Sequence, residues 1–176
     1  MPSGMRELTC MLTKPLIGGT KLADNPKGYA GLVRCFVGER LGRTCLDANF
    51  VFQRLVSPHG DFWQDFYAPS RERIEANHGK FLDMVNELAN KPITVFVIDG
   101  KEGVVDYVKR LQGRTNGEID SATLRGRLKM WGIKSSKGCN YVHASSSQQV
   151  DGITENVRDL RILIKYGYIP KSFLEQ

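Results

Sequence analysis

With 176 residues, of which 41% are hydrophobic and 25% charged, the chain has the length and composition of one soluble globular domain with a proper core. No run approaches the roughly 18 uninterrupted apolar residues of a membrane span, and the first residues lack the pattern of a secretory signal. The formal net charge of +6 favours anionic partners such as nucleotides or nucleic acid, although Lys and Arg are scattered and form no block.

The chain begins with alternating strand and helix patterns. Residues 7–13 form a β-prone run that stops at Pro15, because proline cannot donate to a strand ladder. A Gly- and Asn-rich loop follows, and the apolar spacing over 29–42 then predicts a helix. The alternating apolar residues of 49–57 predict a second strand.

Two helical segments and a buried strand occupy the middle of the chain. The segment 61–79 is helical with an interruption at Pro69, and 78–90 carries apolar residues at the i, i+3, i+4 and i+7 positions of an amphipathic helix. Residues 93–99, ITVFVID, are an almost continuous β-branched and aromatic run, which predicts a strand buried on both faces.

The last third contains a helix over 102–113 closed by glycine, an irregular stretch over 115–128, a short strand over 140–145 and a final helix over 153–167. This order of elements predicts a ferredoxin-like fold of the α+β class. We therefore expect one domain over 1–176, built as an α/β sandwich with a four-stranded antiparallel sheet and helices on one face.

Five short segments carry motifs that are weak individually but specific when they occur in this order. They are LTKP at 12–15, the helix-and-strand segment HGKFLDMVNELANKPITVFVIDG from 78, GRTN at 113–116, TLRG at 123–126 and NYVHASSS at 140–147. Together they resemble the nucleoside diphosphate kinase family, least well between 18 and 75. Against the family pattern the chain has insertions near 18–27 and 132–139.

The resemblance implies a nucleoside diphosphate kinase that works by a ping-pong mechanism. The γ-phosphoryl group of an NTP would move to His143 and then to an NDP, since a neutral imidazole nitrogen attacks phosphorus directly. The nucleotide and phosphate contacts carried over from the family are Lys14, which is also catalytic, Met84, Lys109, Thr115, Arg125 and Asn140. The family further implies a homo-oligomer, hexameric or tetrameric.

Three other side chains are implied near the imidazole. Tyr67 matches an active-site tyrosine, and Ser145 matches the first serine after the histidine. The carboxylate that orients the ring is Asp159 or Glu155, with Asp159 favoured.

The helix over 102–113 offers two neighbouring cations for the phosphates. The alignment favours Lys109, whereas side-chain chemistry favours Arg110, because arginine binds phosphate through two donors.

Magnesium is the cofactor that the resemblance implies. It would be held mainly by the nucleotide phosphates, so no protein metal ligands are expected. The spacing of the three histidines gives no metal site, and four widely spaced cysteines favour free thiols in the cytoplasm over a disulfide framework or a zinc site.

Three departures from the family pattern keep alternatives open. Ala144 replaces a glycine, Ser146 replaces an acid, and Lys80 stands where the family stacks the base on phenylalanine. The first alternative is an impaired, family-like module that binds nucleotides or protein. The second is a nucleic-acid-binding ferredoxin-like domain, which is less favoured because the central strands supply few aromatic residues. His143 taken alone would more often be a structural residue at a strand end.

Overall fold

The computed structural model describes residues 5–16, 21–114, 120–134 and 140–175. Its centre is a four-stranded antiparallel sheet in the order β2-β3-β1-β4. The strands are β1 (Arg6–Thr13), β2 (Asn49–Val56), β3 (Ile93–Lys101) and β4 (Val142–Ala144). The four-stranded antiparallel sheet expected for this α+β fold is confirmed.

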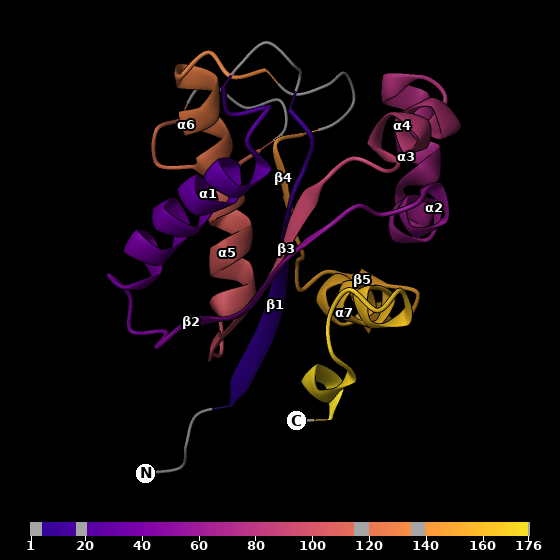
Figure 1. The fold of residues 1–176 in the computed structure, drawn as a ribbon. Helices are drawn as coiled ribbons and strands as arrows, with labels where there is room; N and C mark the ends of the chain where they lie inside the picture. The colour runs from indigo at the N-terminus through magenta and orange to yellow at the C-terminus, as the bar shows by residue number, and fades with distance from the viewer. Residues whose placement is uncertain (1–4, 17–20, 115–119, 135–139, 176) are drawn as a thin grey trace.

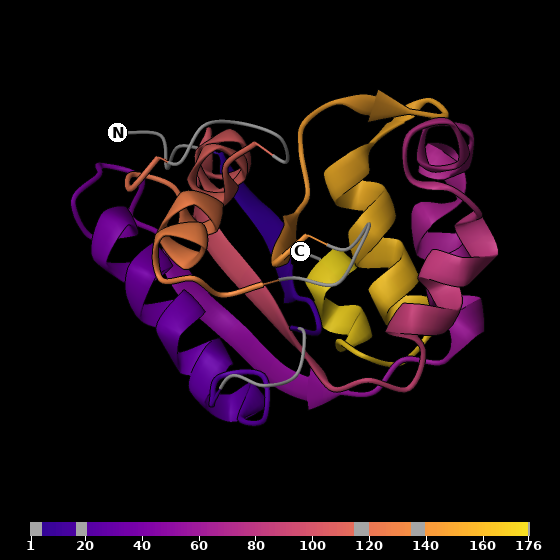
Figure 2. The ribbon, with the colours of Figure 1, turned by 90° about the horizontal axis from the view of Figure 1, so that it is seen from above.

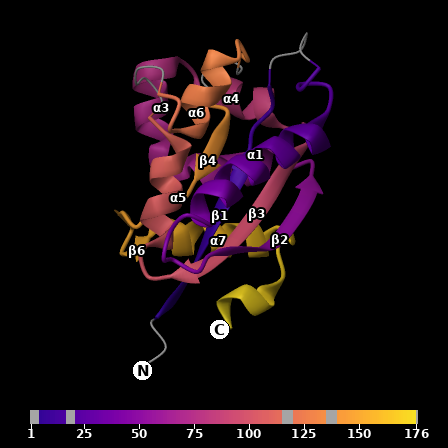
Figure 3. The same ribbon diagram turned by 90° about the vertical axis from the view of Figure 1, so that its left-hand side faces the viewer.

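Helices cover both faces of this sheet, so the expectation of one covered face was wrong (Figures 1 and 2). One face carries α1 (Pro26–Leu41), α5 (Val104–Gln112) and α6 (Leu124–Met130). The other carries α2 (Gly60–Tyr67), α3 (Arg71–His78), α4 (Phe81–Leu88) and α7 (Glu155–Lys165). In Figure 3, α1 and α5 lie in front of the strands.

The alternation of side chains along the central strands explains the two covered faces. Met11 and Phe96 pack into the core beneath α1 and α5, whereas Leu12 and Val97 pack into the second core beneath α2, α4 and α7. Because every residue from Ile93 to Ile98 is buried, both faces need a helical cover.

Prolines and caps set the helix boundaries. Asn25 caps α1 through Gly28 N, with Pro26 in the first turn. The interruption expected at Pro69 is a short 3₁₀ segment, η1 (Ala68–Ser70), between α2 and α3. A second, η2 (Lys171–Leu174), follows α7. No described helix combines the length and apolar character that crossing a bilayer requires.

One helix and one β-hairpin in the last third of the chain were not predicted. Helix α6 forms within and beyond the stretch expected to be irregular, and a hairpin of β5 (Gln149–Val150) and β6 (Ile153–Thr154) precedes α7. Asp151 and Gly152 make the hairpin turn with φ of 51° and 83°, as tight two-residue turns require. The expected insertions fall partly on 17–20 and 135–139, outside the described residues.

Candidate active site

A cavity of about 480 Å³ opens at the edge of the sheet where β4 lies beside α2, α5, α6 and α7. His143 contributes to its wall from β4. The described lining also contains five cationic side chains, which are Lys14, Arg73, Lys109, Arg125 and Arg158, and one carboxylate, Glu155. Such a lining favours an anionic ligand.

Strand register aims the His143 side chain at the α2 and α7 side of the sheet. His143 pairs with Leu12 in the sheet. Both side chains are on the face of the sheet opposite to that of Val142 and Ala144, which pack under α1 and α5. The imidazole Nε2 lies 2.9 Å from Asp159 Oδ2, and the ring is only 12% exposed. Burial lowers the pKa of His143 below its ordinary 6.5, and the bond to Asp159 opposes that shift.

A chain of polar groups holds the Asp159 carboxylate, which is 1% exposed. Ser145 Oγ donates to Asp159 Oδ2 at 2.7 Å, and the Cys10 sulfur lies 2.9 Å from the same hydroxyl. Because the Ser145 proton is already given to Asp159, the Cys10 thiol is the donor in that second contact. Burial also raises the pKa of Cys10 well above its ordinary value.

Aromatic rings from the end of α2 pack against the imidazole. The Phe66 ring centroid lies 4.9 Å from that of His143, and the Tyr67 centroid lies 6.3 Å away, both edge to face. Lys14 Nζ sits 4.6 Å from the Tyr67 ring centre. The sequence analysis missed Phe66, although its place beside Tyr67 at a helix end was a usable signal.

Side chains from α5 and α6 brace β4 behind His143. Gln112 donates to Val142 O at 3.3 Å and accepts from Ala144 N at 3.0 Å. Arg125 donates to Val142 O at 2.8 Å and to Gly113 O at 2.9 Å. Burial lowers the pKa of Arg125 to about 10. Thus Arg125 reaches the cavity wall while it fixes the backbone on both sides of it.

No protein-family model and no curated protein sequence matches this chain. Solved structures do. A Borrelia burgdorferi nucleoside diphosphate kinase with bound vanadate and ADP matches at TM-score 0.60 and 19% identity, over 95% of this chain and 89% of that chain. The Aquifex aeolicus nucleoside diphosphate kinase matches at 0.61 and 18%, over 90% and 95%.

A third match is the Halobacterium salinarum nucleoside diphosphate kinase in complex with CDP, at TM-score 0.58 and 19% identity, over 90% of this chain and 87% of that chain. The chain has the nucleoside diphosphate kinase fold. At these identities the likeness establishes the fold and leaves the activity to be argued from the site.

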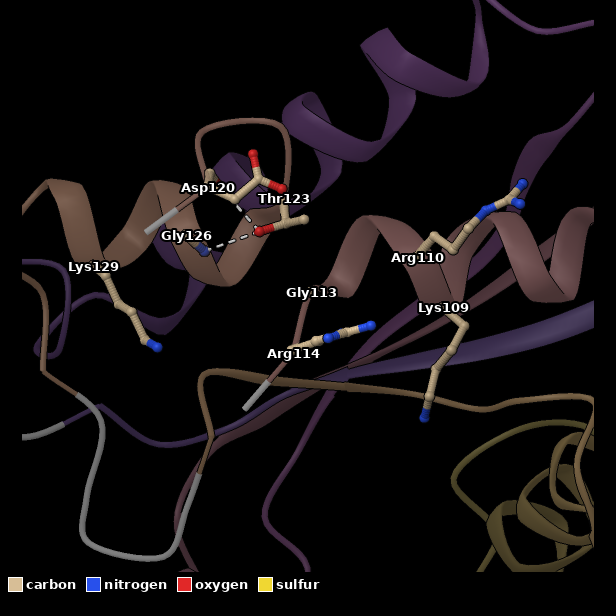
Figure 4. Close-up of a pocket in the computed structure, with 8 residues that line it drawn as sticks. All are labelled: Lys109, Arg110, Gly113, Arg114, Asp120, Thr123, Gly126 and Lys129. Carbon is tan, nitrogen blue, oxygen red and sulfur yellow. Dashed lines mark hydrogen bonds between the residues drawn. The ribbon is translucent and has the colours of Figure 1, made fainter. Parts of the chain in front are cut away.

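Within the nucleoside diphosphate kinase fold, Lys109 and Arg110 differ in direction. The two side chains point to opposite sides of α5 (Figure 4). Lys109 Nζ donates to Ala144 O at 2.6 Å and lies 3.6 Å from Glu155 Oε2 at the cavity of His143. Both side chains line a neighbouring cavity of about 610 Å³ between α5 and α6, but only Lys109 is also among the described lining of the His143 cavity.

Position 146, where the family pattern has an acid, is a serine that contacts a carboxylate from another element of this nucleoside diphosphate kinase fold. Ser146 N and Oγ both donate to Glu155 Oε2, at 2.9 and 2.5 Å. Glu155 begins α7 just after the hairpin, so it reaches the loop where Ser146 lies. A carboxylate therefore stands beside that loop even though position 146 is serine.

The structure shows the surroundings of the other two departures from the family pattern, Ala144 and Lys80. Ala144 is buried in β4 and is absent from the described residues with positive φ, so the position does not require glycine. Lys80 precedes α4 and lines a separate cavity with Phe81 and Leu82, away from His143.

The remaining predicted site residues divide into three groups. Lys14, Tyr67 and Asn140 line the cavity of His143. Met84 is buried in the core under α4 and is not among the described residues of the cavity wall. Thr115 lies outside the described residues.

The cluster of His143, Glu155 and Asp159 is poorly suited to bind a metal ion directly. Ligand atoms of His143, Glu155 and Asp159 lie within 4.8 Å of one another. However, both carboxylates already accept hydrogen bonds from serines, and Arg158 and Lys109 place positive charge beside them. We assign no protein-held metal to this cluster.

Proposed function

We propose that the chain is a nucleoside diphosphate kinase, which moves the γ-phosphoryl group of an NTP to His143 and from there to an NDP. The observation that carries the proposal is the His143 imidazole, 12% exposed and bonded through Nε2 to Asp159, at the wall of a cavity lined by cations. The likeness to solved nucleoside diphosphate kinases supports it.

The chemistry follows from which nitrogen keeps the proton. With the proton on Nε2 and accepted by Asp159, the lone pair of Nδ1 attacks the γ-phosphorus. The N–P bond forms as the bond from phosphorus to the β,γ-bridging oxygen breaks, and the NDP leaves with that electron pair. A second NDP reverses the step, and Asp159 stabilises the positive charge that the phosphorylated ring carries.

The cavity cations supply the electrostatic part of catalysis. Lys14, Lys109 and Arg125 would face phosphate oxygens whose charge spreads in the transition state, and Asn140 would bind the ribose. Magnesium fits this lining as an ion carried by the phosphates, because the described wall offers one carboxylate, Glu155, among five cations. When bound, magnesium would neutralise the transferred group.

Nucleoside di- and triphosphates are the proposed ligands. We further propose that the chain acts as one domain over 1–176, in the cytoplasm, and as a homo-oligomer, either hexameric or tetrameric. Free described thiols at Cys10, Cys35 and Cys45 accord with a reducing compartment.

The test is a labelling experiment with γ-labelled ATP and magnesium. We expect an acid-labile, base-stable adduct that added NDP discharges, and none in His143→Ala. His59→Ala is the matched control, because His59 is exposed and bonds to Asn90 away from the cavity. A wild-type protein without the adduct, or an adduct that persists in His143→Ala, contradicts the proposal.

One observation favours a second candidate, a nucleotide-binding module without turnover. Lys109 and Arg125 already donate to backbone carbonyls of Ala144, Val142 and Gly113, so their hydrogen-bonding capacity is partly used. Saturable binding of ADP by a protein that forms no phosphohistidine would select this candidate.

A further inference from the structure

Arg158 occupies a position that the family pattern does not assign. It precedes Asp159 on α7, and its side chain is only 14% exposed. Its guanidinium donates from Nη1 to Asp159 Oδ1 at 2.9 Å, and from Nη2 to the carbonyls of Asp65 and Phe66 at 2.7 and 2.6 Å. The guanidinium therefore lies between α7 and the end of α2.

On the α7 side, Arg158 completes the hydrogen bonds around Asp159. Oδ2 accepts from His143 and Ser145, and Oδ1 accepts from Arg158. A carboxylate held at both oxygens cannot rotate without breaking a hydrogen bond. The guanidinium charge also offsets the pull of the carboxylate on a proton at His143 Nε2.

On the α2 side, Arg158 binds two carbonyls in the last turn of the helix, of which Asp65 O also accepts from Ala68 N. The last carbonyls of a helix have no intrahelical donor, and a basic side chain is a favourable partner for them. These carbonyls belong to the turn that carries Phe66 and Tyr67, whose rings pack against His143. One guanidinium thus ties the orienting carboxylate to the aromatic wall.

We propose that Arg158 is a positioning residue that fixes the His143 ring between the Asp159 carboxylate and the aromatic end of α2. The inference rests on the proposed function, because ring orientation matters for an attack on phosphorus. Among the described residues, the other titratable or charged side chains near the imidazole are Glu155 of α7, Lys109 of α5, Arg125 of α6, Arg73 of α3, Cys10 of β1, Tyr67 at the end of α2, and Lys14 just after β1.

The first test measures the pKa of His143 by NMR in unliganded protein with labelled histidine. In Arg158→Gln we expect that pKa to rise, because Asp159 and Glu155 remain while a positive charge is removed. Arg158→Lys should leave it near the wild-type value. Arg161→Gln, an exposed change on the same helix, is the matched control and should move nothing.

The second test measures phosphohistidine formation and ADP affinity. Misplacing the ring should slow adduct formation by about ten- to a hundredfold in Arg158→Gln, with a much smaller loss of ADP affinity from the removal of one of five cavity cations. Arg158→Lys should recover only part of the rate, because an ammonium lacks the planar fork that spans Asp159 and the α2 carbonyls.

An unchanged His143 pKa in folded Arg158→Gln overturns the proposal. If ADP binding is also weaker in that variant, Arg158 is a phosphate ligand instead. If Arg158→Gln does not fold, a wild-type rate in Arg158→Lys overturns it. The pKa is measured without nucleotide. A wild-type protein that forms no adduct therefore contradicts the proposed kinase activity. The shift in the His143 pKa of Arg158→Gln still tests whether Arg158 positions the ring.

Discussion

Asp159 decides which nitrogen of His143 carries the proton. A neutral imidazole has one N–H, and an acceptor at Nε2 places it there, so that Nδ1 keeps its lone pair. The sequence left Asp159 and Glu155 as alternatives, because the unpredicted hairpin shifts the register of α7. Only the fold separates them, since Asp159 contacts the ring while Glu155 contacts Ser146 and Lys109.

The pH dependence of adduct formation follows from the environment of His143. Burial lowers its pKa below 6.5, so the imidazole is more than half neutral at pH 6.5, and the rate should drop to half of its plateau value only below that pH. In Asp159→Asn the hydrogen bond that opposes the shift loses its charge. We therefore expect the acid limb to move to still lower pH and the plateau rate to fall by up to about four orders of magnitude.

Pre-steady-state labelling across the acid range measures both effects. Asp151→Asn, the same change in the exposed hairpin turn, should leave the profile unaltered. An acid limb at higher pH in Asp159→Asn would show that this carboxylate does not support the protonated ring.

Helix α6 shows where local patterns were insufficient. Its seven residues, which include a glycine, lie largely within the stretch 115–128 that was expected to be irregular. Thr123 nonetheless caps it through Gly126 N at 3.2 Å, and Leu124 and Leu128 are fully buried against α1 and α5. Tertiary burial, which no local window displays, makes this helix, whereas strongly periodic or β-branched segments such as 93–99 were predictable.

Gly126 of the TLRG motif is required by packing. A Cβ at this position would fall on the backbone of Asp120, so Gly126→Ala should destabilise the protein by about 1–3 kcal/mol and disturb the helix that carries Arg125. Gly31→Ala on α1 meets nothing within 4 Å and should instead stabilise by about 0.5–1 kcal/mol. Urea unfolding of both variants measures the difference, and equal midpoints would contradict this reasoning.

At the scale of the molecule, five of the basic residues that are scattered along the sequence come together in the fold. Five cations that are far apart along the chain line one cavity, because β4 lies at the sheet edge where α2, α5, α6 and α7 all reach it. The order of motifs predicted most of this convergence. It did not predict Arg73 or Arg158, which match no motif, or that Met84 would lie in the core.

Charge concentrated in this cavity predicts how ligands compete. ADP should bind far more tightly than adenosine, tripolyphosphate should displace it, and its affinity should fall as salt rises. Calorimetry at low and high salt tests this, with adenosine as the matched ligand. Equal affinities for ADP and adenosine would contradict it. Tighter, steeply salt-dependent binding of an RNA oligomer would favour the nucleic-acid alternative.

The contact between Ser146 and Glu155 bears on how this protein is compared with others. An alignment that pairs residues one by one records an acid lost at position 146. In space a carboxylate is nevertheless present there, carried by a residue nine positions later and brought back by a hairpin. A comparison of this chain with others should therefore consider which charged groups lie beside a loop in space, as well as which residue stands at each aligned position.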